Sequence, residues 1–170
     1  DVNHALPQEV DMTCDVAIVG GGVAGATLAA ALKNTGMKVA LVELQPQAVA
    51  AAKTQVYAIS LLSAQIFEDI GVWEQIRPHI TPFRKIRLSD ADYPGVVEFY
   101  PEDLGRKEEL GYVAEHGALI KPLQDFLNVS DHITWFCPAE VVKVEYESDG
   151  VILEVRDAAN ADGEAVYRRI

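Results

Sequence analysis

The stretch VAIVGGGVAGATLAAALKNTGMKVALVE, residues Val16–Glu43, decides the fold class. Its first part, Val16–Leu32, carries no charged residue and could be mistaken for a membrane span. A span needs about 20 apolar residues, whereas this run is bounded by Asp15 and Lys33 and is interrupted by Gly20–Gly22. We therefore interpret it as two elements that are joined at the glycines.

These two elements begin a strand–helix–strand unit. Asp15–Val19 is short, β-branched and apolar on both faces, as is typical of a strand buried in a parallel sheet. From Val23 onward, Ala and Leu predict a helix, which is expected to stop at Asn34–Gly36, with Gly36 in the left-handed position past its end. Met37–Leu44 then predicts a second strand, so the whole has the size of a βαβ unit.

The glycines in the first turn of this unit match the pattern GxGxxG, with Gly20, Gly22 and Gly25. The first glycine permits a tight turn, the second lets the backbone approach a pyrophosphate, and the third lets helix and strand pack closely. The helix N-terminus attracts the anion. Glu43 follows at about the 20-residue spacing at which an acid accepts hydrogen bonds from a ribose 2′-hydroxyl. The pattern predicts FAD or NAD rather than NADP, and its alternative is a packing turn without a ligand.

Composition narrows the class of protein. The 170 residues fit one domain or slightly more. The chain has 14 basic and 26 acidic side chains, which give a net charge of −12. Because such a charge repels the phosphate backbone, we do not expect nucleic acid as a partner. Residues 1–15 contain no Lys or Arg, so there is no basic region of a signal peptide. Cys14 and Cys137 lack metal-binding spacing; we expect no metal site, and favour a reducing, cytoplasmic location.

The middle of the chain departs from a plain NAD-binding domain. Ser60–Gly71 predicts an amphipathic helix that Ser60 caps and Gly71 ends. Instead of another parallel strand, Lys85–Asp90 and Val96–Tyr100 then predict the two strands of a hairpin. Inserted antiparallel strands after one βαβ unit argue against a simple dehydrogenase.

The last third of the chain is predicted to contain one helix followed by short strands. Gly117–Leu127 predicts a helix. Thr134–Ile170 predicts several short strands in a meander, with Asp149–Gly150 and Asp162–Gly163 as its turns.

At this point a family resemblance covers nearly the whole chain from Asp15. After Gly20–Glu43, the segments follow in the order VYAISLLSAQIFEDIGVWEQI, KIRLSDADYPGVVEFYPEDL, LGYVAEHGALIKPL and CPAEVV. In this order they resemble the FAD-dependent aromatic-ring hydroxylases, above all the polyprenylphenol hydroxylases of ubiquinone and related quinone biosynthesis. The resemblance implies an α/β fold: a Rossmann-like βαβ FAD-binding domain with inserted antiparallel strands, the N-terminal part of a flavin monooxygenase fold.

The resemblance also implies an activity. FAD would be the cofactor and NAD(P)H the co-substrate, and O2 would supply the oxygen that hydroxylates an aromatic small molecule, a prenylated phenol of quinone biosynthesis. Such a substrate is hydrophobic and implies peripheral contact with a membrane, for which the acidic charge gives no support. Two alternatives stay open: another flavoprotein, such as a prenyl-chain reductase, or a nucleotide-binding module without catalysis.

The resemblance divides the chain into four parts: residues 1–14 as an N-terminal extension, 15–80 as the FAD-binding βαβ unit with the following helices, 81–110 as a hairpin on the side of the substrate domain, and 111–170 as a helix and β-meander that return to the FAD-binding domain. The later flavin motifs of the family, an Asp-Gly and a Gly-Asp pair, are absent from the sequence. We therefore expect this chain to be the N-terminal part of a longer protein and to be inactive alone.

Several site residues follow from the resemblance, while no catalytic residue can be assigned. Gln55 stands where the family has an arginine that faces the FAD phosphates, so a charge-assisted contact is missing. His116 stands beside the linking chain of the flavin, and its alternative is a surface residue near a helix start. Val141 stands where a backbone edge meets the adenine, and its alternative is a core strand residue. The full predicted cofactor site is Gly20, Gly22, Val23, Ala24, Gly25, Glu43, Leu44, Gln55, His116 and Val141.

Overall fold

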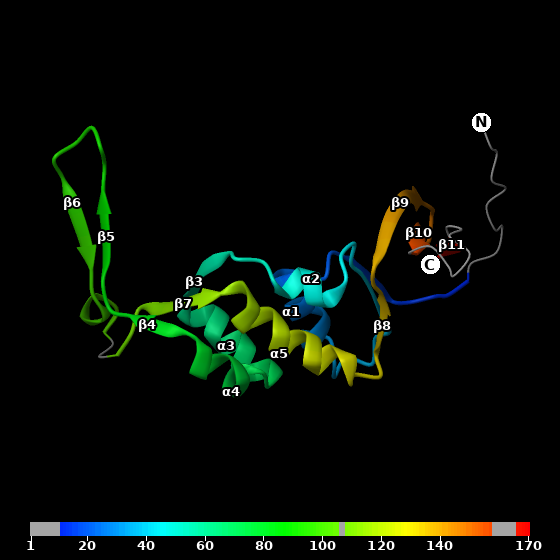
Figure 1. Ribbon diagram of the computed structural model, residues 1–170, viewed down its shortest axis with the longest axis horizontal. Coiled ribbons are helices and arrows are strands. Elements are labelled where there is room, and N and C mark those ends of the chain that lie inside the picture. The colour runs from blue at the N-terminus through cyan, green and yellow to red at the C-terminus, as the bar shows by residue number, and fades with distance from the viewer. Residues whose placement is uncertain (1–10, 106–107, 158–165) are drawn as a thin grey trace. The chain divides into compact units, whose positions relative to one another are not determined.

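The computed structural model describes residues 11–105, 108–157 and 166–170 (Figure 1). The chain divides into two compact units, which are described separately. The first unit contains the chain up to Ala52 and again from Leu123, and the second contains Lys53–Pro122. The domain limits inferred from the sequence stay a prediction.

The first unit contains the predicted βαβ unit. The parallel strands β1 (Val16–Val19), β2 (Val39–Val42) and β8 (Ile133–Phe136) form a sheet in the order β1-β2-β8, and α1 (Val23–Ala31) connects β1 to β2. All four residues of β2 are buried, which explains why its sequence is apolar on both faces. The predicted parallel pairing of the first two strands is confirmed.

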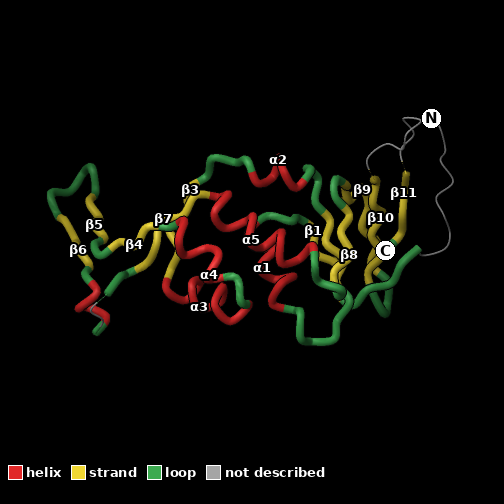
Figure 2. The backbone as a smooth tube through the Cα atoms, turned by 60° about the horizontal axis from the view of Figure 1, so that its bottom comes forward, coloured by secondary structure: helices red, strands yellow, loops and turns green. Residues whose placement is uncertain are grey.

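A second sheet in the same unit is an antiparallel meander. It contains β9 (Ala139–Tyr146), β10 (Val151–Asp157) and β11 (Val166–Arg169) in the order β11-β10-β9 (Figure 2). The Glu147 N–H donates to the Gly150 carbonyl at 2.9 Å, which confirms the first predicted turn. The other predicted turn, at Asp162–Gly163, lies outside the described residues. One hydrophobic core joins both sheets, with Ala40, Val42, Phe136, Ala139, Leu153, Val155 and Ile170 as its buried members.

Three predictions for this unit were wrong. Strand β1 is not buried on both faces, because Ile18 is its only buried residue and Val19 is 62% exposed. Thr134–Phe136 does not belong to the meander, because β8 pairs with the second edge of β2, with Ile133 opposite Val39. A strand that is buried on both faces needs a partner on each edge to satisfy its backbone groups, and β8 supplies the second one. Helix α1 ends at Ala31, although Gly36 does have the predicted left-handed conformation, with φ of +78°.

The second unit is built on an antiparallel sheet in the order β3-β7-β4, with β3 (Val56–Ser60), β4 (Thr81–Phe83) and β7 (Gly111–Glu115). Helix α3 (Leu61–Ile70) confirms the predicted amphipathic helix. The Ser60 hydroxyl accepts a hydrogen bond from the Ser63 N–H at 3.1 Å, and Gly71 ends the helix with φ of +95°. The sequence had indicated the helix and both of its limits, but it had not indicated the sheet.

The remaining elements are a hairpin and several helices. The predicted hairpin is confirmed as β5 (Ile86–Ser89) and β6 (Val96–Phe99), and the predicted later helix is α5 (His116–Asn128), which begins in the second unit and ends in the first. The short helical segments are α2 (Gln47–Ala51), α4 (Trp73–Ile76), η1 (Arg77–His79) and η2 (Pro101–Leu104). None of the helices in the described ranges has both the length and the apolar character needed to cross a membrane.

Candidate functional site

The loop between β1 and α1 has the backbone geometry of a tight turn. Gly20 has φ of +108°, a conformation that side chains other than glycine rarely adopt, and its N–H donates to the Val42 carbonyl at 2.8 Å. A Cβ atom on Gly25 would run into the carbonyl oxygen of Gly20, so the start of α1 lies directly against the turn. The turn therefore requires glycine at both positions, for two different reasons.

Gly22 differs from these two glycines because its surroundings are open. A Cβ atom built on Gly22 meets nothing within 4 Å, and the φ of −70° causes no strain. Gly22 caps α1, and the Ala26 N–H donates to its carbonyl at 2.8 Å. Fold geometry therefore does not require glycine here, whereas close approach of a ligand to the backbone would.

The N-terminus of α1 lacks the side chains that usually satisfy a helix start. Among the described residues, no side chain caps α1, and its first turn contains no acidic residue. The first N–H groups of a helix have no partner within the helix and carry a partial positive charge. This end of α1, which includes Val23 and Ala24, can therefore bind an anion such as a pyrophosphate.

Glu43 follows β2 and contacts the glycine loop directly. Its Oε2 accepts a hydrogen bond from the Gly21 N–H at 2.8 Å, and its Oε1 accepts one from the Gln45 N–H at 2.9 Å. A carboxylate has about four acceptor positions, so each oxygen of Glu43 can still accept a hydroxyl group. The neighbouring Leu44 is 62% exposed.

The second unit brings Gln55, Tyr57 and His116 together at the start of α5. His116 is only 3% exposed, so its interpretation as a surface residue was wrong. Its Nδ1 lies 3.0 Å from the Tyr57 hydroxyl, which donates to Gln55 Oε1 at 3.1 Å. The His116 N–H donates to the Gln55 carbonyl at 2.8 Å. The remaining ring nitrogen, Nε2, is buried without a partner among the described residues.

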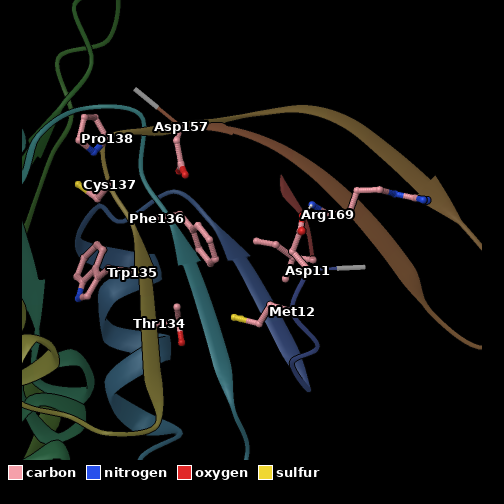
Figure 3. A pocket seen from close by; sticks show the side chains of 10 residues that line it. Asp11, Met12, Thr134, Trp135, Phe136, Cys137, Pro138, Asp157 and Arg169 are labelled. Atoms are coloured by element: carbon pink, nitrogen blue, oxygen red, sulfur yellow. Dashed lines mark hydrogen bonds between the residues drawn. The ribbon is translucent and has the colours of Figure 1, made fainter. Parts of the chain in front are cut away.

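Two hollows in the described part of the chain lie away from the predicted cofactor residues. One of about 620 Å3 lies between β8 and the antiparallel sheet, where Phe136, Met12 and Arg169 line it (Figure 3). Another, of about 760 Å3, includes Val19 and Val151 in its lining. Neither is lined by a predicted cofactor residue. No group of three or more His, Cys, Asp or Glu side chains within the described ranges could hold a metal ion.

Comparison with known proteins decides the family. The family described as "FAD binding domain" matches residues 13–98, just over half of the 170 residues. The chain belongs to this FAD-binding family. The preference for FAD over NAD is confirmed, and the glycine loop, the open N-terminus of α1 and the Glu43 carboxylate fit this cofactor.

Relatives of this FAD-binding chain confirm the resemblance to hydroxylases. It is 39% identical over 170 aligned residues to an uncharacterised protein of Synechocystis, covering 94% of this chain and 41% of that protein. It is 29% identical to the ubiquinone hydroxylase UbiL of Rhodospirillum rubrum, covering 94% of this chain and 36% of UbiL. The chain thus spans about two fifths of the length of these curated relatives.

A solved structure confirms the fold. The flavin-dependent monooxygenase PieE, solved in complex with FAD and substrate, matches with a TM-score of 0.72 and 22% identity. The match covers 95% of this FAD-binding chain and 29% of PieE. The expected α/β fold, which matches part of a flavin monooxygenase fold, is therefore present.

Sequence reasoning missed several residues around Glu43. A Cβ atom on Gly21 would lie 3.0 Å from atoms of both Glu43 and Trp135, which explains a third glycine that the GxGxxG pattern does not need. The Cys137 thiol donates to the Gln45 carbonyl at 3.1 Å. Burial, and then the charge of Glu43, raise the pKa of Cys137. The run of three glycines was the available signal. Gly21 is not part of the GxGxxG pattern, so its lack of a side chain indicated a close contact with another residue.

Val141 lies in β9, the outer strand of the antiparallel sheet. Its side chain is partly buried and packs against the hydrophobic core. This packing agrees with the alternative interpretation of Val141 as a core residue of a strand. A contact between its backbone and the adenine stays a prediction.

Proposed function

We propose that the protein containing this chain is an FAD-dependent monooxygenase that hydroxylates an aromatic ring and uses NAD(P)H and O2. The observation that carries the proposal is the glycine loop of a chain in the FAD-binding family. Gly20 and Gly25 are required by the fold, whereas Gly22 is open to a ligand. A prenylated phenol of quinone biosynthesis is the proposed substrate class, which is supported by the relative named as a ubiquinone hydroxylase.

In this proposal, the residues of the chain bind and orient the cofactor. Gly22 and the first-turn N–H groups of α1 hold the pyrophosphate, while Glu43 accepts hydrogen bonds from the ribose and keeps the loop in place through Gly21. When bound, FAD supplies the transfer of electrons from NAD(P)H and the activation of O2. Contacts from Leu44, Gln55, His116 and Val141 are also proposed, on the basis of the family resemblance.

The proposed location follows from the chemistry of the substrate. A prenylated phenol partitions into lipid, so the protein would work in the cytoplasm at a membrane surface. The two cysteines of the chain, Cys14 and Cys137, are both free thiols, which fits a reducing compartment. The net charge of −12 opposes attraction to anionic headgroups, so any contact would be apolar.

The test uses the longest natural form of the protein. It should purify yellow, or become yellow with added FAD, and should oxidise NAD(P)H while transferring one atom of isotopically labelled O2 into a prenylated phenol. The matched Gly22→Ala variant should lose bound flavin while keeping its fold. A colourless protein that FAD cannot reconstitute would overturn the proposal.

Two further outcomes separate the alternatives. A yellow protein that never incorporates labelled oxygen, with any phenol tested, would be a nucleotide-binding module without this activity. A yellow protein that instead reduces double bonds of a prenyl chain would be a reductase.

A further inference from the structure

The ring of His116 is buried and contacts the Tyr57 hydroxyl. His116 is only 3% exposed, and its Nε2 is buried without a hydrogen-bond partner among the described residues. Buried polar atoms in folded proteins are nearly always satisfied, and a specific exception requires an explanation. A ligand that supplies the missing hydrogen bond is one such explanation.

Tyr57 controls which kind of hydrogen bond this nitrogen can make. The Tyr57 hydroxyl carries one proton and donates it to Gln55 Oε1 at 3.1 Å. His116 Nδ1, at 3.0 Å from the same oxygen, must then carry the ring proton and donate it to Tyr57. In a neutral imidazole, which carries a single ring proton, His116 Nε2 is consequently left as an acceptor.

The reverse arrangement has the opposite result. If Gln55 turns its amide nitrogen toward Tyr57, the hydroxyl donates to His116 Nδ1, and Nε2 carries the proton. With a neutral ring, a phosphate oxygen can pair with Nε2 only in this second arrangement, because phosphate only accepts. A hydroxyl group both donates and accepts, so it pairs with Nε2 in either arrangement.

The backbone holds Tyr57 and His116 in this relation. Tyr57 in β3 lies opposite Ala114 in β7, and His116 follows directly after β7. The hydrogen bond from the His116 N–H to the Gln55 carbonyl, at 2.8 Å, extends this antiparallel pairing by one step. Side chains on paired strands keep their geometry better than side chains on loops, which suits a positioning function.

We propose that Tyr57 is a positioning residue that fixes the ring of His116, so that Nε2 accepts a hydrogen bond from a hydroxyl of the ribityl chain of FAD. The assignment rests on the proposed function, because it takes FAD as the ligand. Tyr57 acts through His116, and Gln55 acts through Tyr57.

The first test removes only the hydroxyl, by Tyr57→Phe in the longest natural form of the protein. The affinity for FAD should fall about threefold to tenfold, as for a lost neutral hydrogen bond. In the apo protein, the ring-nitrogen NMR shifts of His116 should change from one fixed tautomer to a mixture. Tyr112→Phe is the matched control, because Tyr112 lies in β7 of the same sheet and its hydroxyl bonds to Glu109 at 2.5 Å. It should change neither quantity.

The second test asks whether Tyr57 acts through His116. In a His116→Ala background, Tyr57→Phe should cause no further loss of FAD affinity. Equal additional losses in both backgrounds would overturn the inference, as would an unchanged His116 tautomer in Tyr57→Phe. If the unmodified protein binds FAD and Tyr57→Phe binds it equally well, the inference fails and the proposed function stands. If the unmodified protein binds no FAD, both fail.

Discussion

The carboxylate of Glu43 accepts a hydrogen bond from the Gly21 N–H, with 2.8 Å between Glu43 Oε2 and the Gly21 nitrogen. The two residues lie 22 positions apart, at the ends of the two strands that α1 connects. Glu43 Oε1 also accepts from the Gln45 N–H at 2.9 Å. Glu43 therefore fixes the glycine loop through hydrogen bonds within the chain itself.

The first prediction is that Glu43 contributes to both stability and binding. Glu43→Ala leaves two backbone N–H groups without their acceptor, so the free energy of unfolding of the apo protein should fall by about 1–3 kcal/mol. Glu43→Gln keeps one acceptor oxygen, so its free energy of unfolding should lie between those of the unmodified protein and Glu43→Ala. The affinity for FAD should fall in the order Glu, Gln, Ala. Urea unfolding and FAD titration measure these two effects.

Asp15→Ala is the matched control for Glu43→Ala. The Asp15 carboxylate accepts a hydrogen bond from the Lys38 N–H at 2.7 Å, at the opposite end of the same strands. Its loss should lower stability without changing the affinity for FAD. If Glu43→Ala behaved like this control, Glu43 would be a structural residue only.

The second prediction separates Gly22 from Gly25. Gly25→Ala should destabilise the apo protein by about 1–3 kcal/mol, because the added methyl group meets the Gly20 carbonyl. Gly22→Ala should leave the apo unfolding curve unchanged, because the space around it is open, and should weaken FAD binding at least about tenfold by blocking the pyrophosphate. Equal FAD affinity for Gly22→Ala and the unmodified protein would reduce the loop to a packing turn.

The local parts of the fold could be predicted from the sequence. The GxGxxG turn, the cap at Ser60 and the stop at Gly71 each depend on the conformation of a few neighbouring residues, which the sequence states directly. The pairing of β8 with β2 could not be predicted, because residues 53–122 separate the two strands as a second unit. The pairing of strands that are distant in the sequence depends on which edge of the sheet lacks a partner strand. The periodicity of apolar residues carries no information about this.

The candidate site shows the same division. The glycines and Glu43 could be identified from the sequence, because the GxGxxG pattern and the acid that follows it are defined by their spacing along the chain. Tyr57 could not, because its contact with His116 joins residues 59 positions apart and depends on the register of β3 with β7. Gln55 was identified because it lacks the positive charge of an arginine. The structure adds that its Oε1 accepts a hydrogen bond from the Tyr57 hydroxyl.

The third prediction concerns alkaline pH. Burial, and then the hydrogen bond to Glu109, raise the pKa of Tyr112 to about 12. The unfolded chain has a tyrosine pKa of about 10. The folded state therefore holds the proton more tightly, so stability should be independent of this group below about pH 10 and should fall between about pH 10 and 12. Absorbance titration of the phenolates should show one late-titrating tyrosine, which Tyr112→Phe removes together with this part of the pH dependence.

The last prediction is that Gln55→Arg tightens FAD binding about fivefold, or ~1 kcal/mol, at low salt, because it restores a charge-assisted phosphate contact. The gain should shrink as salt screens the charge, and Gln55→Lys should gain less because it lacks the forked contact. An arginine side chain cannot accept a hydrogen bond, so the Tyr57 hydroxyl must turn and donate to His116 Nδ1. Ring-nitrogen NMR should then show the proton on Nε2. The contrary result would be that Gln55→Arg leaves the affinity for FAD unchanged at both low and high salt, while Gly22→Ala still binds FAD weakly. The phosphate contact would then lie at another residue, and Lys53 would be the next one to substitute.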